Sequence, residues 1–210
     1  MKTAVTLDGR TAFPDGRSQW ITGEAARADV QFWRGRAGAV LTGIGTVLAD
    51  DPQMNVRLPD QERQPLRFVI DPRMETPPAG KLLTSKGGKV FIAAAAEYPT
   101  RRAALEAAGA EVWVLPDAAV PGRVDLRELM RELAKREVNE VHVEAGPRLS
   151  GALFAAGLID EMLFYYAPCL FGAGMGPAAV PLPAEPGAAY RWRLQSLDQI
   201  GGDFRVLLRR

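Results

Sequence analysis

The sequence is poor in the residues that bind transition metals or act as nucleophiles. Its 210 residues include one cysteine, Cys169, and one histidine, His142. A zinc site built from these residue types needs three or four ligands, so zinc hydrolases, zinc fingers and zinc deaminases are excluded, and we expect no metal. A catalytic triad would have to use His142, which lies among apolar residues and is interpreted as structural, and no Gly-x-Ser-x-Gly motif is present.

Disulfide pairs, long apolar runs and an excess of charge are also lacking. A single cysteine fits a reducing cytoplasm. The longest apolar run, Val90–Ala96, is far shorter than the roughly 20 residues of a membrane span, and the N-terminus lacks a signal-peptide core. A net charge of +1 predicts no nucleic-acid partner, and the 47% apolar content suits one domain over residues 1–210.

The remaining pattern is an alternation of strands and helices, which is typical of α/β proteins. We expect a mixed, mostly parallel sheet with helices on both faces, closed by an antiparallel hairpin around Gly201-Gly202. The predicted strands are Lys2–Leu7, Ala39–Leu41, Leu66–Ile70, Lys89–Ala94, Glu111–Leu115, a strand beginning at Val141, Glu161–Tyr166, Arg191–Ile200 and Phe204–Arg209. The predicted helices are Gly23–Arg36 with Thr22 as N-cap, Thr46–Ala49, Thr100–Ala108, Leu126–Arg136 and one opening at Gly146-Pro147.

Polar residues and glycine turns follow three of the predicted strands, at Asp8-Gly9, Thr42-Gly43 and Glu144-Ala145-Gly146. The carboxyl ends of parallel strands gather at one edge, where α/β sheets place their ligands. A helix that opens from glycine presents free N–H groups, which suit phosphate. The segment from Glu144 therefore offers an anion site beside a carboxylate, although an ordinary strand-to-helix turn explains it equally well.

Four other side chains have a functional and a structural interpretation. Arg34 and Arg57 either bind a substrate phosphate or are solvated surface arginines. Trp20 either stacks on a flat ring or caps the core. Asp50 is unfavourably placed in the last turn of a short helix, which suggests a functional reason for it.

These motifs occur together, in order and spacing, in a known family. The segments that carry the resemblance are Leu7–Ala12, Ser18–Thr22, Thr46–Pro52, Val56-Arg57, Val69–Asp71 and Val143–Pro147. They resemble the reductase domain of the bifunctional bacterial riboflavin-biosynthesis protein, over about residues 2–206. The resemblance implies a dihydrofolate-reductase-like fold and NADPH-dependent reduction of 5-amino-6-(5-phosphoribosylamino)uracil to the ribitylamino product.

The resemblance also assigns roles to individual positions. It implies NADPH contacts at Ala4, Trp20, Thr46, Asp50, Gly146, Pro147, Arg148, Leu149, Ser150, Gly151 and Ala152. It implies substrate contacts at Ser18, Arg34, Met54, Arg57 and Glu144. No protein nucleophile is needed, and the proton comes from Asp50, Glu144 or water. We favour Glu144 as an acceptor for pyrimidine N–H groups.

Several alternatives stay open. The family's zinc deaminase domain is absent from these 210 residues, so we expect a stand-alone reductase or an excised domain, in either case a homodimer. The substrate is alternatively the diamino analogue or dihydrofolate, and a nucleotide-binding module without turnover would keep the same glycine turns. Arg73 is the first candidate for the cation that selects the NADPH 2′-phosphate, ahead of a set of competing residues: Lys81, Lys86, Arg101 and Arg102.

Overall fold

A computed structural model describes residues 1–59 and 61–210, which form two compact units. One unit is Gln31–Glu144, and the other combines Met1–Val30 with Ala145–Arg210. We call them the parallel unit and the antiparallel unit after their sheets. The boundary falls within helix α1, Glu24–Arg36, so this helix contributes residues to both units.

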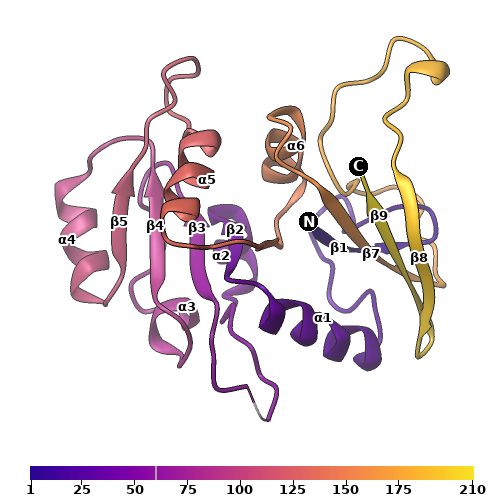
Figure 1. The fold of residues 1–210 in the computed structure, drawn as a ribbon, viewed down its shortest axis with the longest axis horizontal. Helices are drawn as coiled ribbons and strands as arrows, with labels where there is room; N and C mark the ends of the chain where they lie inside the picture. The colour runs from indigo at the N-terminus through magenta and orange to yellow at the C-terminus, as the bar shows by residue number, and fades with distance from the viewer. Residues whose placement is uncertain (60) are drawn as a thin grey trace. The chain divides into compact units, whose positions relative to one another are not determined.

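The parallel unit is built on five strands in the order β5-β4-β3-β2-β6, all of them paired in parallel (Figure 1). The strands are β2 Ala39–Gly43, β3 Leu66–Ile70, β4 Val90–Ala94, β5 Glu111–Val114 and β6 Val141–Val143. The helices between them are α2 Ile44–Asp50, α3 Lys81–Thr84, α4 Pro99–Ala107 and α5 Leu126–Lys135. The five strands are mostly apolar, as expected for parallel strands that are buried on both faces.

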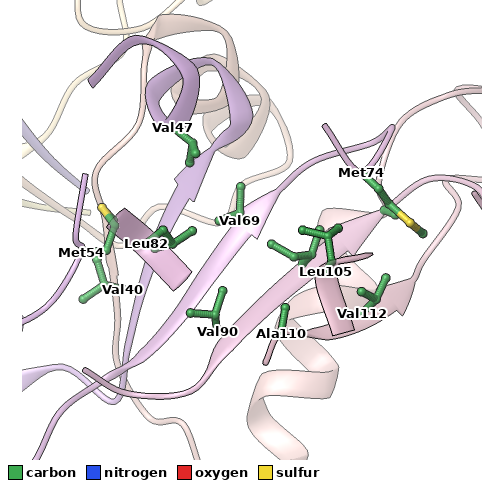
Figure 2. Packing of buried hydrophobic residues seen from close by; sticks show 12 residues of the cluster. Val40, Val47, Met54, Val69, Met74, Leu82, Val90, Leu105, Ala110 and Val112 are labelled. Atoms are coloured by element: carbon green, nitrogen blue, oxygen red, sulfur yellow. The ribbon is translucent and has the colours of Figure 1, made fainter. Parts of the chain in front are cut away.

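Each face of this sheet carries its own apolar layer. On one face Val40 and Val69 pack with Val47 of α2, Leu82 of α3 and Leu105 of α4 (Figure 2). The other face is aromatic, because the rings of Phe68, Phe91 and Trp113 pack with centroids 4.5–5.3 Å apart. Helices therefore cover a sheet that has no solvated face, as the alternating sequence pattern predicts.

The antiparallel unit holds a four-stranded sheet in the order β1-β7-β9-β8 (Figure 1). Its strands are β1 Lys2–Thr6, β7 Glu161–Ala167, β8 Arg193–Ile200 and β9 Asp203–Arg209, with β1 parallel to β7 and the other pairs antiparallel. Helix α6, Pro147–Ala155, and a short 3₁₀ turn, Pro186–Ala188, complete the unit. The hairpin around Gly201-Gly202 is confirmed, and Gly201 supplies its positive φ of 62°.

The α/β class is confirmed, but several details differ from the expectation. Helix α2, for example, begins at Ile44 and ends at Asp50, whereas Thr46–Ala49 was predicted. The ladders form two sheets, so the Asp8-Gly9 strand end belongs to a different sheet from those at Thr42 and Glu144. Helix α1 begins at Glu24, so Gly23 rather than Thr22 occupies the cap position, and Asp203 accepts the Gly23 N–H at 2.7 Å. The sequence pattern did not predict helix α3, because one helical turn is too short to show a hydrophobic period.

No helix in the described ranges 1–59 and 61–210 combines the length and the apolar character that a bilayer crossing requires.

Candidate functional site

The central feature of the parallel unit is a paired carboxylate and guanidinium at the end of β6. Glu144 accepts hydrogen bonds from Arg34 of α1, at 2.5 Å from Nε to Oε1 and 2.9 Å from Nη2 to Oε2. The two side chains are only 11% and 16% exposed. A bidentate, largely buried pair of this kind holds both groups in one orientation. It presents a fixed carboxylate beyond the carboxyl end of a parallel strand.

A second guanidinium is held near this pair by an irregular segment that follows α2. Arg57 donates from Nη1 to Oδ1 of Asn55 at 3.0 Å, and Arg34 donates from Nη1 to the Asn55 carbonyl at 3.2 Å. The Asn55 amide donates to the Lys86 carbonyl, and Gln31 of α1 accepts the Arg57 N–H. Side chains thus replace the missing secondary structure and fix the Arg57 backbone.

The two arginines influence each other electrostatically. Burial on its own would lower the pKa of Arg34, but the charge and hydrogen bonds of Glu144 outweigh it and hold the pKa above the ordinary value. The pKa of Arg57 is lowered by burial and by the positive charge of Arg34, with Glu144 acting in the opposite direction. Two cations therefore share one carboxylate, and the local charge is +1, which favours an anionic ligand.

Arg57 has more unused hydrogen-bonding capacity than Arg34. Three of the five N–H groups of Arg34 are taken by Glu144 and the Asn55 carbonyl. Arg57 is exposed, and the described residues take one of its side-chain N–H groups. Arg57 is therefore the better placed of the two to bind phosphate, while Arg34 mainly orients Glu144.

Met54 lies in the core rather than at a surface. Its side chain is 3% exposed and packs near Val40 and Leu82 (Figure 2). Its backbone is unusual, with φ at +55°. A ligand contact at this position, as the resemblance implies, would therefore use main-chain atoms.

The turn from β2 into α2 carries the other predicted residues of the parallel unit. Thr46 is partly buried in the first turn of α2, and Asp50 is exposed at the last residue of this helix. Asp51 has the αL conformation with φ at +42°, and its carboxylate accepts the Lys81 N–H at 2.7 Å. Asp51 is thus a turn residue that connects α2 to the start of α3, as its position before Pro52 indicates.

In the antiparallel unit the predicted phosphate turn has the expected form. Gly146 precedes α6 with φ −69° and ψ 170°, and Pro147 is the first helical residue. A Cβ added at Gly146 would meet no atom within 4 Å, so neither backbone strain nor packing demands glycine here. The helix provides N–H groups without intrahelical partners, and Gly146 and Arg148 are exposed.

Other residues of the same helix are explained by packing. A Cβ added at Gly151 would lie 2.2 Å from the Ala179 carbonyl oxygen, so the close approach of this chain segment requires glycine. Ser150 is 1% exposed, and its hydroxyl donates to the Ala145 carbonyl at 3.2 Å. Leu149 and Ala152 are partly buried. The exposed first turn is therefore the part of α6 that remains available to a ligand.

Three further predicted residues also lie in the antiparallel unit. Trp20 is 71% exposed, so it does not cap the core, and Arg27 lies over its ring at 4.8 Å. Ala4 lies on β1 opposite Tyr165 in register, and Ser18 is partly buried in the loop before α1.

Sequence reasoning missed the polar residues that hold the site together. Asn55 stands between two predicted contacts, Met54 and Arg57, and its position was the only available signal. Gln31 and Gln64 hold the backbone of the same segment, and Gln64 exchanges two hydrogen bonds of 2.9 Å with Val56. Nothing in the local sequence pairs residues this far apart.

The fold and the site together define an α/β protein with charged side chains at the carboxyl ends of parallel strands. A family model described as "RibD C-terminal domain" matches residues 1–206. The chain is 36% identical to the riboflavin biosynthesis protein RibD of Escherichia coli, covering 97% of this chain and 57% of that protein. The same protein of Haemophilus influenzae is also 36% identical, with 98% and 56% covered.

Solved structures support the same relationship. Acinetobacter baumannii RibD superposes with a TM-score of 0.86 at 36% identity, covering 99% of this chain and 56% of that chain. A Thermotoga maritima protein described as a diaminohydroxyphosphoribosylaminopyrimidine deaminase/5-amino-6-(5-phosphoribosylamino)uracil reductase has a TM-score of 0.80 at 25% identity, with 99% and 55% covered.

The chain therefore belongs to the RibD C-terminal domain family, and the resemblance found in the sequence is confirmed. The chain spans roughly half the length of the curated relatives that it matches.

Proposed function

We propose that this chain is an NADPH-dependent reductase of 5-amino-6-(5-phosphoribosylamino)uracil. The observation that carries the proposal is the bidentate Arg34–Glu144 pair with Arg57 held beside it. Such a group recognises a ligand that has both a phosphate and a polar heterocycle. Family membership supports the proposal, since the Thermotoga maritima relative is described by this reductase activity.

The proposal gives a role to each charged side chain of the site in the parallel unit. Arg57, assisted by the two remaining N–H groups of Arg34, binds the substrate phosphate. Glu144 accepts N–H groups of the pyrimidine, because a carboxylate is an acceptor and Arg34 holds this one in a fixed orientation. The reduction adds hydride at C1′ of the opened ribosylamino group, and the nicotinamide supplies this hydride when bound. The matching proton comes from Asp50, Glu144 or water.

The residues of the antiparallel unit that fit the cofactor are the Gly146 turn and Trp20. The first turn of α6 offers N–H groups to the pyrophosphate, and the exposed Trp20 ring offers a flat apolar face. In the parallel unit, Lys81 pairs with Asp51, Arg102 pairs with Glu97 and Glu106, and Arg101 donates to the Arg73 carbonyl. Arg73 therefore stays our choice for the 2′-phosphate, with Lys86 as its competitor. We further propose that residues 1–210 act as one cytoplasmic reductase domain and as a homodimer.

One assay tests the function directly. The absorbance of NADPH is followed with the aminouracil substrate, with its diamino analogue and with dihydrofolate. Oxidation with the aminouracil alone is expected. Preference for either other compound would replace the substrate assignment, and no oxidation with any of them would favour a nucleotide-binding module.

Truncation of Arg57 is expected to weaken substrate binding and to leave the stability of the fold nearly unchanged. Arg57→Ala removes a charge-assisted contact, so the KM for the aminouracil should rise at least about tenfold, or about 1.4 kcal/mol. The midpoint of urea unfolding should change little, because the side chain is exposed. A rise in KM of less than about threefold would remove Arg57 from the phosphate site.

Two alanine substitutions on α6 separate ligand binding from packing. Gly146→Ala places a methyl group in open space where the phosphate would lie, so the KM for NADPH should rise about fivefold with stability kept within about 1 kcal/mol. Gly151→Ala drives a methyl group into the Ala179 backbone and should cost about 2 kcal/mol in unfolding free energy. Steady-state kinetics and urea unfolding distinguish them, and a Gly146→Ala enzyme with unchanged KM would place the cofactor elsewhere.

A further inference from the structure

His142 on β6 is buried beside the site and has an unused ring nitrogen. Its side chain is 7% exposed, and Nε2 has no hydrogen-bond partner among the described residues. The same atom lies 3.3 Å from Oε1 of Glu144. Buried polar atoms are normally paired, so an unpaired nitrogen next to a carboxylate calls for an explanation.

The strand geometry makes this proximity a fixed property of the fold. His142 and Glu144 are two residues apart, so their side chains share one face of the sheet. His142 is in register with Val40 of β2, and the Glu144 N–H continues the ladder to the Leu41 carbonyl at 2.9 Å. Thr42 follows Leu41 in β2 and so lies next to Glu144, and in the described part of the chain its buried hydroxyl has no hydrogen-bond partner. Two unused polar groups thus flank Glu144.

Several charged groups of the parallel unit surround the ring. Glu144 comes from its own strand, Arg34 from α1 and Arg57 from the segment after α2, while β2 contributes only Val40 and Thr42. With a neutral ring the cluster carries +1, and a proton on His142 would raise it to +2. A dianion bound at the arginines lowers the charge to −1 and so favours the protonated ring.

We propose that His142 is a positioning residue that takes up a proton from solvent when a phosphate group occupies Arg34 and Arg57. The imidazolium then donates from Nε2 to Oε1 of Glu144. It keeps the carboxylate oriented while the guanidinium of Arg34 is shared with the phosphate. The inference rests on the proposed function only in requiring a phosphate-bearing ligand.

The proposed coupling between proton uptake and anion binding predicts the direction in which anion affinity changes with pH. If the bound state holds the proton more tightly, the extra affinity is present at low pH and is lost as pH rises through the midpoint of the bound state. Sulfate is a suitable probe, because its charge does not change between about pH 5 and 8, where histidine titrates. A shift of one pH unit in the midpoint corresponds to a tenfold change in sulfate affinity across that range.

The test uses NMR of the untagged chain, in which His142 is the only histidine and its ring signals need no assignment. Saturating sulfate should raise the pH midpoint of these signals by about one unit, a size of shift that neighbouring charges produce. Arg57→Gln should abolish that shift, whereas Glu140→Gln, which alters an exposed pair with Arg36, should keep it. A midpoint that moves by less than about 0.2 units, or sulfate that does not bind up to about 100 mM, overturns the proposal.

A kinetic comparison adds a variant and separates this inference from the proposed function. His142→Gln should raise the KM for the aminouracil at low pH and leave kcat within about twofold, since the residue touches Glu144 and no reacting atom. A KM–pH profile that is the same in both enzymes contradicts the inference while the reductase assignment stands. A sulfate-dependent shift in a chain without turnover supports the inference while the reductase assignment fails.

Discussion

Glu144→Gln is expected to raise the KM for the aminouracil about 30-fold and to change the KM for NADPH less than about twofold. The substitution keeps the shape of the side chain but removes the charge that holds Arg34 at 2.5 and 2.9 Å. The guanidinium then loses its counterion in a largely buried position, and the pyrimidine loses a fixed acceptor. Steady-state kinetics with each substrate varied in turn measures both constants.

The chain provides a matched control. Glu140 also forms a bidentate pair with an arginine of α1, Arg36, but this pair is about 40% exposed. Glu140→Gln should leave both KM values unchanged, because an exposed pair contributes little and faces no ligand. If Glu144→Gln instead raised the KM for NADPH and left the KM for the aminouracil unchanged, Glu144 would be assigned to the cofactor site.

Arg67→Met is expected to lower the free energy of unfolding by about 4 kcal/mol, the largest stability effect that we predict. Arg67 lies within β3 and is 4% exposed. Its guanidinium donates to three carbonyl oxygens, those of Gly88 at 2.8 Å, Gln53 at 3.0 Å and Leu82 at 2.6 Å. Burial lowers the pKa of this group, and its hydrogen bonds link three separate chain segments. Methionine is of similar length and removes all three hydrogen bonds.

Urea unfolding provides the measurement, with a loss of about 2 M in the midpoint for a slope near 2 kcal/mol/M. Arg63→Met, four residues earlier and exposed, should stay within about 0.5 kcal/mol. Because Arg67 also holds Gln53, its loss should loosen the segment that carries Asn55 and Arg57 and raise the KM for the aminouracil. Equal stability of the two variants would show that the three carbonyls find other donors.

Local sequence patterns predict the limits of several helices and strands closely. The limits of β3 at Leu66–Ile70 agree residue by residue, and α1 and α5 differ from the prediction by one residue at one end. Periodicity succeeds here because each element buries one face or both, so the apolar spacing reports the geometry directly. The same rule fails for α3, since a single turn contains no complete period.

The division of the strands between two sheets could not be predicted in the same way. β1 begins the chain, yet it pairs with β7, more than 150 residues later, and not with β2. Strand pairing depends on contacts between distant segments, which have no local signature. The Asp8 strand end therefore belongs to a different sheet from the Thr42 and Glu144 strand ends, whereas the prediction placed all three in one sheet.

Residue types and their spacing are enough to identify the family of this chain and the kinds of chemistry it can offer. One histidine and one cysteine exclude a zinc centre of these ligands, and the glycine turns and charged strand ends predict the segments that we propose as ligand sites. Only the tertiary structure decided how those residues are used. It paired Glu144 with Arg34, buried Met54 and left His142 with an unused nitrogen beside the carboxylate. The physical reason is that residue type is local, whereas burial and hydrogen-bond partners are set by segments far apart in the chain.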